Sequence, residues 1–256
     1  MKAVLLAAGV GDRLRPFTDN HPKCLVEVGK KTLLVRHLDL LSSIAELGEL
    51  VIVVGYREDQ IRDAVAAWSR ASASPFKVTF EVNPEYKKGS ILSLYTAKDH
   101  LVADDCVIMD ADVLYPRVLM QRLVDSPHKN CFLLDESSER TGEEMMVCVK
   151  DGRALHIDRS RKESTFDEHW DLTGEGVGFF KLDRHDSQAL VQTMRGLIEE
   201  GQDRVEYEAA LDRFMKDYPS GYEPVGDLPW TEIDFIEDVE KAQREVLPHI
   251  EEQGLA

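Results

Sequence analysis

The sequence lacks the features that mark membrane, disulfide-rich and zinc-binding proteins. No stretch approaches about 18 consecutive apolar residues, so a membrane-spanning helix is not expected. The opening MKAVLLAAG has one lysine and a short apolar run, which predicts a first strand rather than a signal peptide. The four cysteines form no CxxC pair. We therefore expect reduced thiols in a cytoplasmic protein and no zinc site.

Positive charge is also scarce. The chain has 31 basic and 48 acidic residues, which gives a formal net charge of −17. Nucleic acids and anionic membrane surfaces repel such a chain, so neither is an expected partner. A phosphorylated ligand would need basic residues gathered locally, or a metal ion. The 256 residues, 43% of them hydrophobic, suit one large domain with ample core.

Short apolar runs alternate with helix-like segments through the first half of the chain. The expected strands are 2–7, 49–55, 76–83 and 106–110, and the expected helices are 32–47, 57–71 and 91–101. Such alternation predicts an α/β fold in which helices cover both faces of a mostly parallel central sheet.

The second half is richer in strands. Its expected strands are 130–135, 145–158 and 174–183, and its expected helices are 186–200, 206–217 and 236–250. Asp151 and Gly152 predict a hairpin turn within the second of these strands. No internal repeat or low-complexity linker appears. We therefore predict one sheet-centred domain that carries a small β-rich insertion able to cover a ligand.

The segment after the first strand, AAGVGDRLRPFTDNHPKCL, has the composition of a phosphate-binding loop. Leu14 stands where a dinucleotide fingerprint has its third glycine, and the Gly-Lys-Ser/Thr of a P-loop does not follow. Gly9 and Gly11 allow a ligand close to the backbone. A tight turn with solvated basic residues is the alternative. The positions of Arg13 and of Lys23, after a proline, favour phosphate binding.

The opening pattern resembles that of the sugar-phosphate and alcohol-phosphate nucleotidyltransferases: a strand, A-A-G-x-G-x-R, then P-K about ten residues later. Further blocks resemble the phosphocholine-cytidylyltransferase-like branch, which also includes inositol-phosphate and aminoethylphosphonate enzymes. These blocks are VVGYREDQI, VNPEYKKGSILSLYTAK, VIMDADVLY, GEGVGFFKL and PWTEIDFIEDVEKA. The resemblance covers nearly the whole chain and implies a Rossmann-like nucleotidyltransferase fold.

Within a single domain spanning 1–256, this resemblance implies three parts. Residues 1–125 would form the nucleotide-binding core, and 126–225 the acceptor-side insertion with its helices. Residues 226–256 would supply metal ligands and the C-terminal helix.

Two acidic pairs are candidates for a magnesium site. Asp110 and Asp112 end an apolar strand, where residues i and i+2 share a face, and Glu232 and Asp234 repeat that spacing before a predicted helix. Mg²⁺ prefers such hard oxygen ligands. Either pair could instead cap a turn or helix, and Asp234 is well placed as an N-cap. The resemblance implies Asp112 and Asp234 as the ligands, assisted by Glu232, with Asp110 on the nucleotide side.

The resemblance also implies a set of nucleotide contacts in the first strand, its loop and the segment after 76–83. These are Leu6, Ala8, Gly9, Gly11, Asn83, Gly89, Ser90 and Asp110. Ser90 could equally be the N-cap of the helix that it starts. Tyr56, which ends the second strand, could simply pack in the same cleft.

The candidate acceptor-binding residues are Glu175, Trp170, Arg159 and Lys162. Aromatic rings bind a quaternary ammonium, and Trp170 is the free aromatic candidate of the insertion, so choline itself is weakly supported. Glu175 could pair with an acceptor amine or hydroxyl, or could be a solvated turn residue. The basic run that includes Arg159 and Lys162 could meet the acceptor's phosphate or could be a solvated charge run.

The resemblance implies a reaction in which CMP passes from CTP to a small phosphorylated alcohol or phosphonate, with release of pyrophosphate. Arg13 is expected to hold the β- and γ-phosphates, and Lys23 to stabilise charge near the α-phosphate. Mg²⁺ is the expected cofactor. Catalysis then consists of positioning and charge neutralisation, because the attacking oxygen is already an anion.

Two other functions stay open. One is a sugar-1-phosphate nucleotidyltransferase that uses UTP, GTP or dTTP, and the other is a nucleotide-binding regulatory module without catalysis. The short second half and the EIDF motif favour a small acceptor, and the complete set of charged residues argues against the inactive module. The expected partners are CTP and that acceptor, with no nucleic acid and no membrane insertion. A homodimer is an open option.

Overall fold

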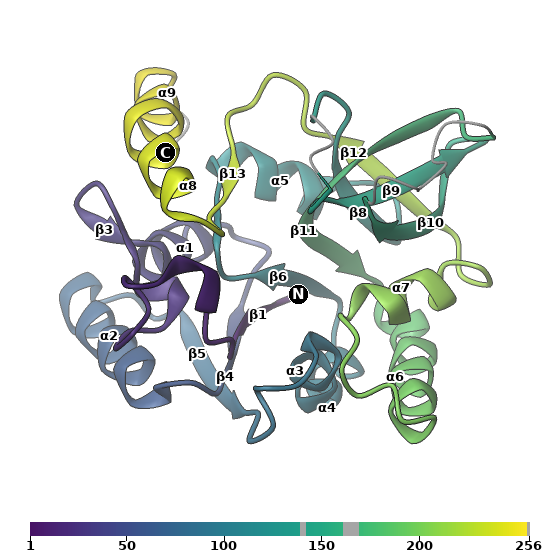
Figure 1. Ribbon diagram of the computed structural model, residues 1–256, viewed down its shortest axis with the longest axis horizontal. Coiled ribbons are helices and arrows are strands. Elements are labelled where there is room, and N and C mark those ends of the chain that lie inside the picture. The colour runs from purple at the N-terminus through teal and green to yellow at the C-terminus, as the bar shows by residue number, and fades with distance from the viewer. Residues whose placement is uncertain (139–141, 161–168, 255–256) are drawn as a thin grey trace.

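The computed structural model describes residues 1–138, 142–160 and 169–254. One nine-stranded sheet crosses the molecule in the order β5-β4-β1-β6-β11-β8-β12-β10-β9 (Figure 1). Its strands are β1 (Lys2–Ala7), β4 (Glu49–Val54), β5 (Lys77–Val82), β6 (Cys106–Asp110), β8 (Asn130–Asp135), β9 (Met145–Lys150), β10 (Arg153–Arg159), β11 (Leu172–Leu182) and β12 (Ser220–Pro224). The remaining strands of the described residues form two short two-stranded sheets: β2 (Glu27–Val28) with β3 (Lys31–Thr32), and β7 (Val113–Leu114) with β13 (Thr231–Glu232).

The first half of the sheet is parallel. β1 lies between β4 and β6, and β5 lies beyond β4, with every pair parallel. Parallel strands joined by helices direct their carboxyl ends to one edge, where open α/β sheets bind ligands. The predicted α/β class is confirmed.

The second half continues the same sheet. β11 pairs antiparallel with β6, β8 and β9, so the predicted insertion is joined edge to edge with the nucleotide half. The two-residue turn between β9 and β10 has Asp151 at φ 51° and Gly152 at φ 71°, as the predicted hairpin requires. The division of the chain into three functional parts stays a proposal.

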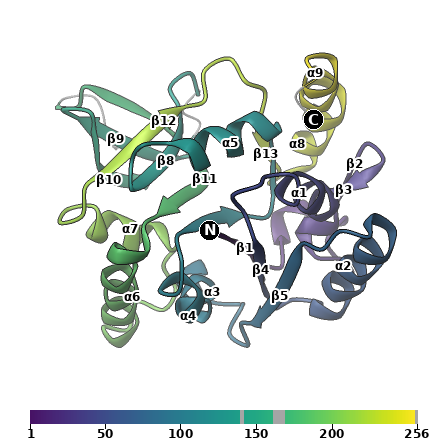
Figure 2. The same ribbon diagram turned by 180° about the vertical axis from the view of Figure 1, so that it is seen from behind.

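Helices cover both faces of the sheet (Figures 1 and 2). Successive residues of β1 point to opposite faces, so Leu5 enters one apolar core and Val4 the other. The first core includes α1 (Leu33–Leu41), α2 (Glu58–Ser72) and α5 (Arg117–Asp125). The second includes α3 (Ser90–Thr96), α4 (Lys98–Leu101), α6 (Arg184–Glu199) and α7 (Glu208–Phe214). Among the described residues, no helix combines the length and apolarity needed to cross a membrane.

Some predicted helices are shorter or divided. α1 ends at Leu41 rather than at 47, because the hydroxyls of Ser42 and Ser43 donate to the carbonyls of Asp39 and Leu40 and compete with the helical pattern. The predicted helix 91–101 divides at Ala97 into α3 and α4. The C-terminal helix is α8 (Ile236–Lys241), a π-helical turn (Ala242–Val246) and α9 (Leu247–Glu252), whose second residue is a proline.

A third apolar cluster joins the first loop to the C-terminal helices. Leu14 and Val26 of the loop region pack with Ile233, Val239 and Leu247 of the C-terminal segment. This packing brings two segments more than two hundred residues apart to the same edge of the sheet. It places the loop after β1 beside the EIDF motif.

Candidate active site

A cavity of about 310 Å³ lies beyond the carboxyl ends of β1 and β6. Many of the residues singled out from the sequence line it: Leu6, Ala8, Gly9, Arg13, Lys23, Ser90, Asp110, Asp112, Arg159, Glu232 and Asp234. Gly11 lines an adjoining cavity that shares Gly9, Arg13 and Lys23. A further cavity of about 480 Å³ includes Glu175 and shares Glu232 and Asp234 with the first.

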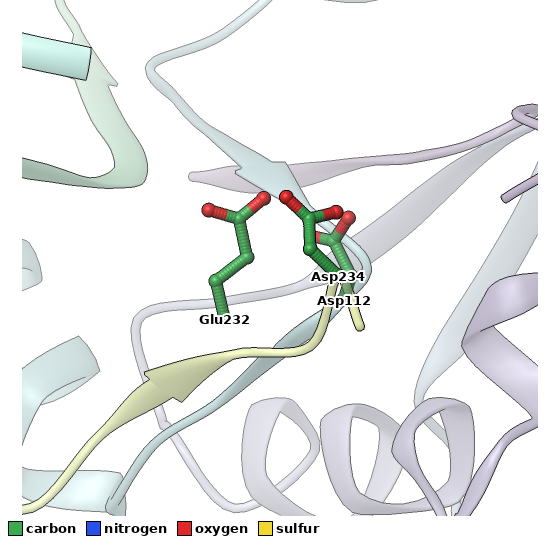
Figure 3. A group of neighbouring side chains, drawn as sticks. All are labelled: Asp112, Glu232 and Asp234. Atoms are coloured by element: carbon green, nitrogen blue, oxygen red, sulfur yellow. The ribbon is translucent and has the colours of Figure 1, made fainter. Parts of the chain in front are cut away.

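The carboxylates of Asp112, Glu232 and Asp234 point toward one another (Figure 3). Among the described residues, these three offer oxygens that all lie within 4.8 Å of one another. The β7–β13 pairing brings them together, because it sets Val113 opposite Glu232 and lets Ile233 N donate to Asp112 O at 3.0 Å. Burial, followed by repulsion from Asp112 and Asp234, raises the pKa of Glu232 well above its usual range.

Lys23 lies between two of these carboxylates. Its Nζ is 2.6 Å from Asp112 Oδ2 and 2.5 Å from Asp234 Oδ1. Burial alone would lower the pKa of Lys23, but attraction to Asp112, Asp234 and Glu232 outweighs it and raises that pKa. Lys23 is therefore a permanently charged group beside the acidic trio, which consists of Asp112, Glu232 and Asp234.

The acidic trio fits a divalent cation. Hard carboxylate oxygens suit Mg²⁺, and Asp112 Oδ1 is buried with no hydrogen-bond partner in the described structure. Lys23 contacts Asp112 and Asp234, and Arg13 contacts Asp234 as well, so two positive charges meet three carboxylates. Asp112 Oδ1 therefore stays open as a ligand oxygen for a cation.

Arg13 is held at the mouth of the cavity by two carboxylates. Its Nη2 donates to Asp234 Oδ2 at 2.6 Å and its Nη1 to Glu143 Oε2 at 3.0 Å. Its guanidinium also lies 5.0 Å from the centre of the Phe235 ring. Arg13 thus ties the first loop to the C-terminal segment.

The N-cap alternative for Asp234 is wrong. Phe235 is the N-cap of α8, and Asp238 accepts from the backbone N–H groups of Phe235 and Asp234 at 2.7 and 2.9 Å. Because Asp238 satisfies the start of the helix, the side chain of Asp234 is available to Lys23 and Arg13.

The glycines of the first loop have distinct tasks. Gly11 adopts φ 70°, and an added Cβ would lie 3.1 Å from Lys23 Cβ, so glycine lets the lysine stem pass close by. Thr18 Oγ1 donates to Gly11 O at 2.7 Å and fixes the turn. A Cβ on Gly9 would meet nothing within 4 Å, which leaves its backbone open to a ligand.

Asp110 lies deeper, with partners that the sequence did not reveal. Tyr207 Oη donates to Asp110 Oδ2 at 3.0 Å, and Glu208 lines the same cavity with a buried, unpartnered Oε2 among the described residues. Burial raises the pKa of Glu208 to about 7 and that of Asp110 well above its usual range. Gly178, at φ 76°, lets β11 approach, because an added Cβ would lie 2.6 Å from Asp110 Oδ2.

Three of the predicted nucleotide contacts, Ser90, Gly89 and Asn83, contact neighbouring protein residues. Ser90 is the first residue of α3 rather than its N-cap, which is Gly89, so the capping alternative is wrong. Its Oγ donates to Glu206 at 2.5 Å and accepts from Tyr207 N at 2.9 Å. Gly89 packs against the backbone of Val205, where any Cβ would clash, and does not line the cavity.

Asn83 also lies away from the cavity lining. Its Nδ2 donates to Ser93 Oγ at 3.0 Å, and its Oδ1 accepts from Glu85 N at 2.9 Å. Tyr56 packs beside Tyr86 and donates from its hydroxyl to Asp19 O at 2.9 Å, in agreement with the packing alternative.

The candidate acceptor-binding residues lie in different parts of the structure. Arg159 lines the first cavity and Glu175 the larger one, while Trp170 packs against Met146 and Cys148 of β9, outside both. Lys162 lies outside the described residues. Glu175 lies half-buried within β11, so it is not a solvated turn residue. Burial raises the pKa of Glu175 to about 7 despite a hydrogen bond from Ser138.

Sequence reasoning missed several residues of the site. Tyr207 and Glu208 begin an ordinary-looking helix, and Glu143 lies in a loop of mixed charge. Trp230 lines the larger cavity, where the sequence had pointed to Trp170. The GEGVGF motif was a usable signal for Gly178, because a glycine inside a strand often marks close backbone approach.

Comparisons with known proteins show which family and which enzymes the chain resembles. The family model described as a MobA-like NTP transferase domain matches residues 3–181. A CTP:phosphoglutamine cytidylyltransferase of Campylobacter jejuni is 24% identical over 94% of this chain and 98% of that protein. The choline-phosphate cytidylyltransferase of Streptococcus pneumoniae is 31% identical over 54% of this chain and 57% of that protein.

Solved structures agree on the fold. The inositol-1-phosphate CTP transferase of T. maritima superposes with a TM-score of 0.74 at 18% identity, covering 100% of this chain and 97% of the other. The CTP:phosphocholine cytidylyltransferase of Streptococcus pneumoniae superposes with a TM-score of 0.69 at 23% identity, covering 94% and 97%. The predicted nucleotidyltransferase fold and enzyme class are confirmed, and the chain belongs to the MobA-like NTP transferase family.

Proposed function

We propose that this enzyme transfers CMP from CTP to a small phosphorylated alcohol or phosphonate and releases pyrophosphate. The observation that carries the proposal is Lys23 held between Asp112 and Asp234, with Glu232 beside them and Arg13 on Asp234. A cation next to hard oxygen ligands, at the edge of a parallel sheet, suits a nucleoside triphosphate. The cytidylyltransferases among its relatives support CTP as the donor.

The cofactor in this proposal is Mg²⁺, held by Asp112 and Asp234 with Glu232 assisting. When bound, it would supply positive charge to the phosphates. Because Lys23 contacts both ligands, its ammonium would lie next to the same phosphates. In this proposal, Lys23 and the metal held by the acidic trio together offset the negative charge of the phosphates.

The proposed chemistry is an in-line displacement at the α-phosphorus. An oxygen of the acceptor's phosphate or phosphonate forms a bond to that phosphorus, and the bond from the α-phosphorus to the bridging oxygen breaks. The electron pair leaves with pyrophosphate, and no proton has to be removed from the nucleophile. Lys23 stabilises charge at the reacting phosphate, and Arg13 stabilises the leaving phosphates.

The larger cavity bears on the acceptor. Acidic side chains dominate its lining, including Asp135 and Glu175, and Trp230 and Phe235 add two aromatic faces. Trp230 Nε1 donates to Asp135 Oδ2 at 2.8 Å, which fixes the indole at this wall. Acidic and aromatic walls favour an acceptor with an ammonium group, such as aminoethylphosphonate or phosphocholine.

One panel assay tests the proposal. CTP, UTP, GTP and dTTP are each combined with phosphocholine, aminoethylphosphonate, inositol phosphate, glycerol phosphate and glucose 1-phosphate, and pyrophosphate release is measured. CTP with an amine-bearing acceptor should give the fastest release and a CDP-linked product by mass spectrometry. Fastest release with a sugar 1-phosphate and UTP, GTP or dTTP would favour the sugar enzyme instead. Nucleotide binding without release in any combination would favour the inactive module.

Two further expectations belong to the same proposal. A cytoplasmic location follows from the reduced cysteines, and localisation of a tagged chain tests it. A homodimer is the expected assembly if the chain associates, and light scattering of the purified protein measures it.

A further inference from the structure

One carboxylate oxygen is shared by two arginines at the mouth of the first cavity. Glu143 Oε2 accepts from Arg13 Nη1 at 3.0 Å and from Arg159 Nη1 at 3.1 Å. Arg13 follows the glycine loop, whereas Arg159 ends β10 on the opposite side of the cavity. Two cations from separate parts of the fold therefore converge on a single oxygen.

Each guanidinium also has an anchor that does not depend on the Glu143 carboxylate. Arg13 Nη2 donates to Asp234 Oδ2 at 2.6 Å, and its guanidinium lies against the Phe235 ring. Arg159 Nη1 donates to the backbone oxygen of Glu143 at 2.9 Å. Both arginines would thus keep their places if the carboxylate turned away.

The carboxylate itself is weakly held. The side chains of Arg13, Glu143 and Arg159 are 45%, 55% and 35% exposed, and ion pairs with that exposure contribute little. A phosphoryl group carries more negative charge than a carboxylate, up to roughly −2, and offers three acceptor oxygens. It would therefore bind two adjacent guanidinium groups better than Glu143 does.

We propose that Arg13 and Arg159 form one oxyanion clamp, and that Glu143 is its internal occupant, displaced when a terminal phosphoryl or phosphonyl group of a substrate binds. Glu143 is a positioning residue, because it keeps two like charges together until the substrate arrives. The assignment of that group to a substrate rests on the proposed function. It is either the γ-phosphate of the nucleotide or the phosphate or phosphonate of the acceptor.

Binding of inorganic pyrophosphate and of aminoethylphosphonate to the full chain, measured by calorimetry, tests the clamp. Glu143→Gln keeps the shape of the side chain and removes its charge, so the affinity for the anion that uses the clamp should rise about two- to fivefold. Glu136→Gln is the matched control, because Glu136 is exposed in the same loop region and lines neither cavity. Unchanged or weaker binding of both anions by Glu143→Gln would overturn the proposal.

A double-mutant cycle separates the clamp from a general effect of charge. Arg159→Gln should weaken binding of the same anion, and Glu143→Gln should give no gain in the Arg159→Gln background, because the clamp is already broken. An equal gain in both backgrounds would mean that Glu143 merely repels anions. Equal melting temperatures of the variants would show that the fold is unaffected.

Steady-state kinetics identify the source of the oxyanion. A lower KM for the nucleotide in Glu143→Gln assigns the clamp to the γ-phosphate, and a lower KM for the acceptor assigns it to the acceptor. The control Glu136→Gln should leave both KM values unchanged, because Glu136 lines neither cavity. Pyrophosphate binding needs no turnover, so the clamp can hold in a chain that fails the CTP panel, and it can fail in one that passes.

Discussion

The two ends of the first cavity hold their charges in different ways. At the inner end, Lys23, Asp112 and Asp234 form ion pairs whose side chains are only 16%, 20% and 17% exposed. At the mouth, Glu143 pairs with Arg13 and Arg159 through side chains that are about a third to a half exposed. Both ends contain the same kinds of groups at similar distances, but water reaches them unequally.

This difference assigns different tasks to the two ends. Removing one partner of a buried ion pair leaves a charge without compensation, whereas an exposed pair exchanges its partner for water at little cost. The carboxylates of the inner end therefore need a cation beside them at all times. The mouth can open its ion pairs for a substrate.

The largest expected effect comes from removing the inner cation. Lys23→Ala should lower the free energy of unfolding by about 3 kcal/mol, because Asp112 and Asp234 lose the cation that they share, while Arg13→Ala should cost about 1 kcal/mol or less. Urea unfolding measures both. Turnover of Lys23→Ala should fall about a hundredfold or more in pyrophosphate release.

Lys23→Arg serves as the control for this comparison, because it keeps the charge but cannot reproduce the single ammonium between two carboxylates. It should retain most of the stability and still lose turnover. Equal destabilisation by Lys23→Ala and Arg13→Ala would mean that the ion pairs at the two ends of the cavity contribute equally to stability. Turnover of Lys23→Ala within a few-fold of wild type would remove Lys23 from catalysis.

A smaller effect is expected where β11 touches the inner end. Gly178→Ala places a Cβ at φ 76° and about 2.6 Å from Asp110 Oδ2, so it should cost about 2 kcal/mol and lower kcat/KM for the nucleotide about tenfold. Gly226→Ala introduces a similar strain, at φ 64° in open space, and should cost about 1 kcal/mol without a change in kcat/KM. Matching activities of the two variants would show that Asp110 tolerates displacement.

The smallest effect concerns the carboxyl group of Glu175, which is half-buried near the acidic side chains of Glu144 and Asp135. Burial raises the pKa of Glu175 from its ordinary value of 4.5 to about 7, so the folded state binds its proton more tightly than the unfolded chain does. Stability from this group is therefore full below about pH 4.5 and declines as pH rises to about 7.

Glu175→Gln should abolish this dependence. Wild type should lose about 1–2 kcal/mol more than the variant between pH 5 and 8, as measured by urea unfolding at each pH. Glu136→Gln, an exposed control, should follow wild type. Parallel pH profiles for wild type and Glu175→Gln would mean that the Glu175 carboxyl group is as well solvated in the folded state as in the unfolded chain.

The sequence predicted the inner end better than the mouth. Asp112, Asp234 and Lys23 stand in short motifs beside apolar strands. Local pattern left capping alternatives open for the carboxylates, and the family resemblance of these motifs implied their roles. Glu143 comes from a loop whose sequence has no such pattern. Its contact with Arg13 depends on how β9 and β10 join the sheet, which no local signal reports.

Other differences have the same origin. Gly89 and Asn83 stand in a block that resembles the nucleotide-binding family, yet they pack against Val205 and Ser93. Ser42 and Ser43 end α1 early because their hydroxyls bond to the preceding turn, a competition that helical periodicity does not register. Trp230 stands in a block that resembles the family and Trp170 does not, but the fold was needed to show which of the two lines a cavity.

The pairing of β11 has a mechanical consequence. β11 bonds to β6 through Phe179–Leu182, and to β9 through Leu172–Glu175, so one strand joins both halves of the cavity. Sliding the halves past each other would break a row of backbone hydrogen bonds. The two halves of the sheet are therefore coupled through β11, and neither half can shift along it without the loss of these bonds.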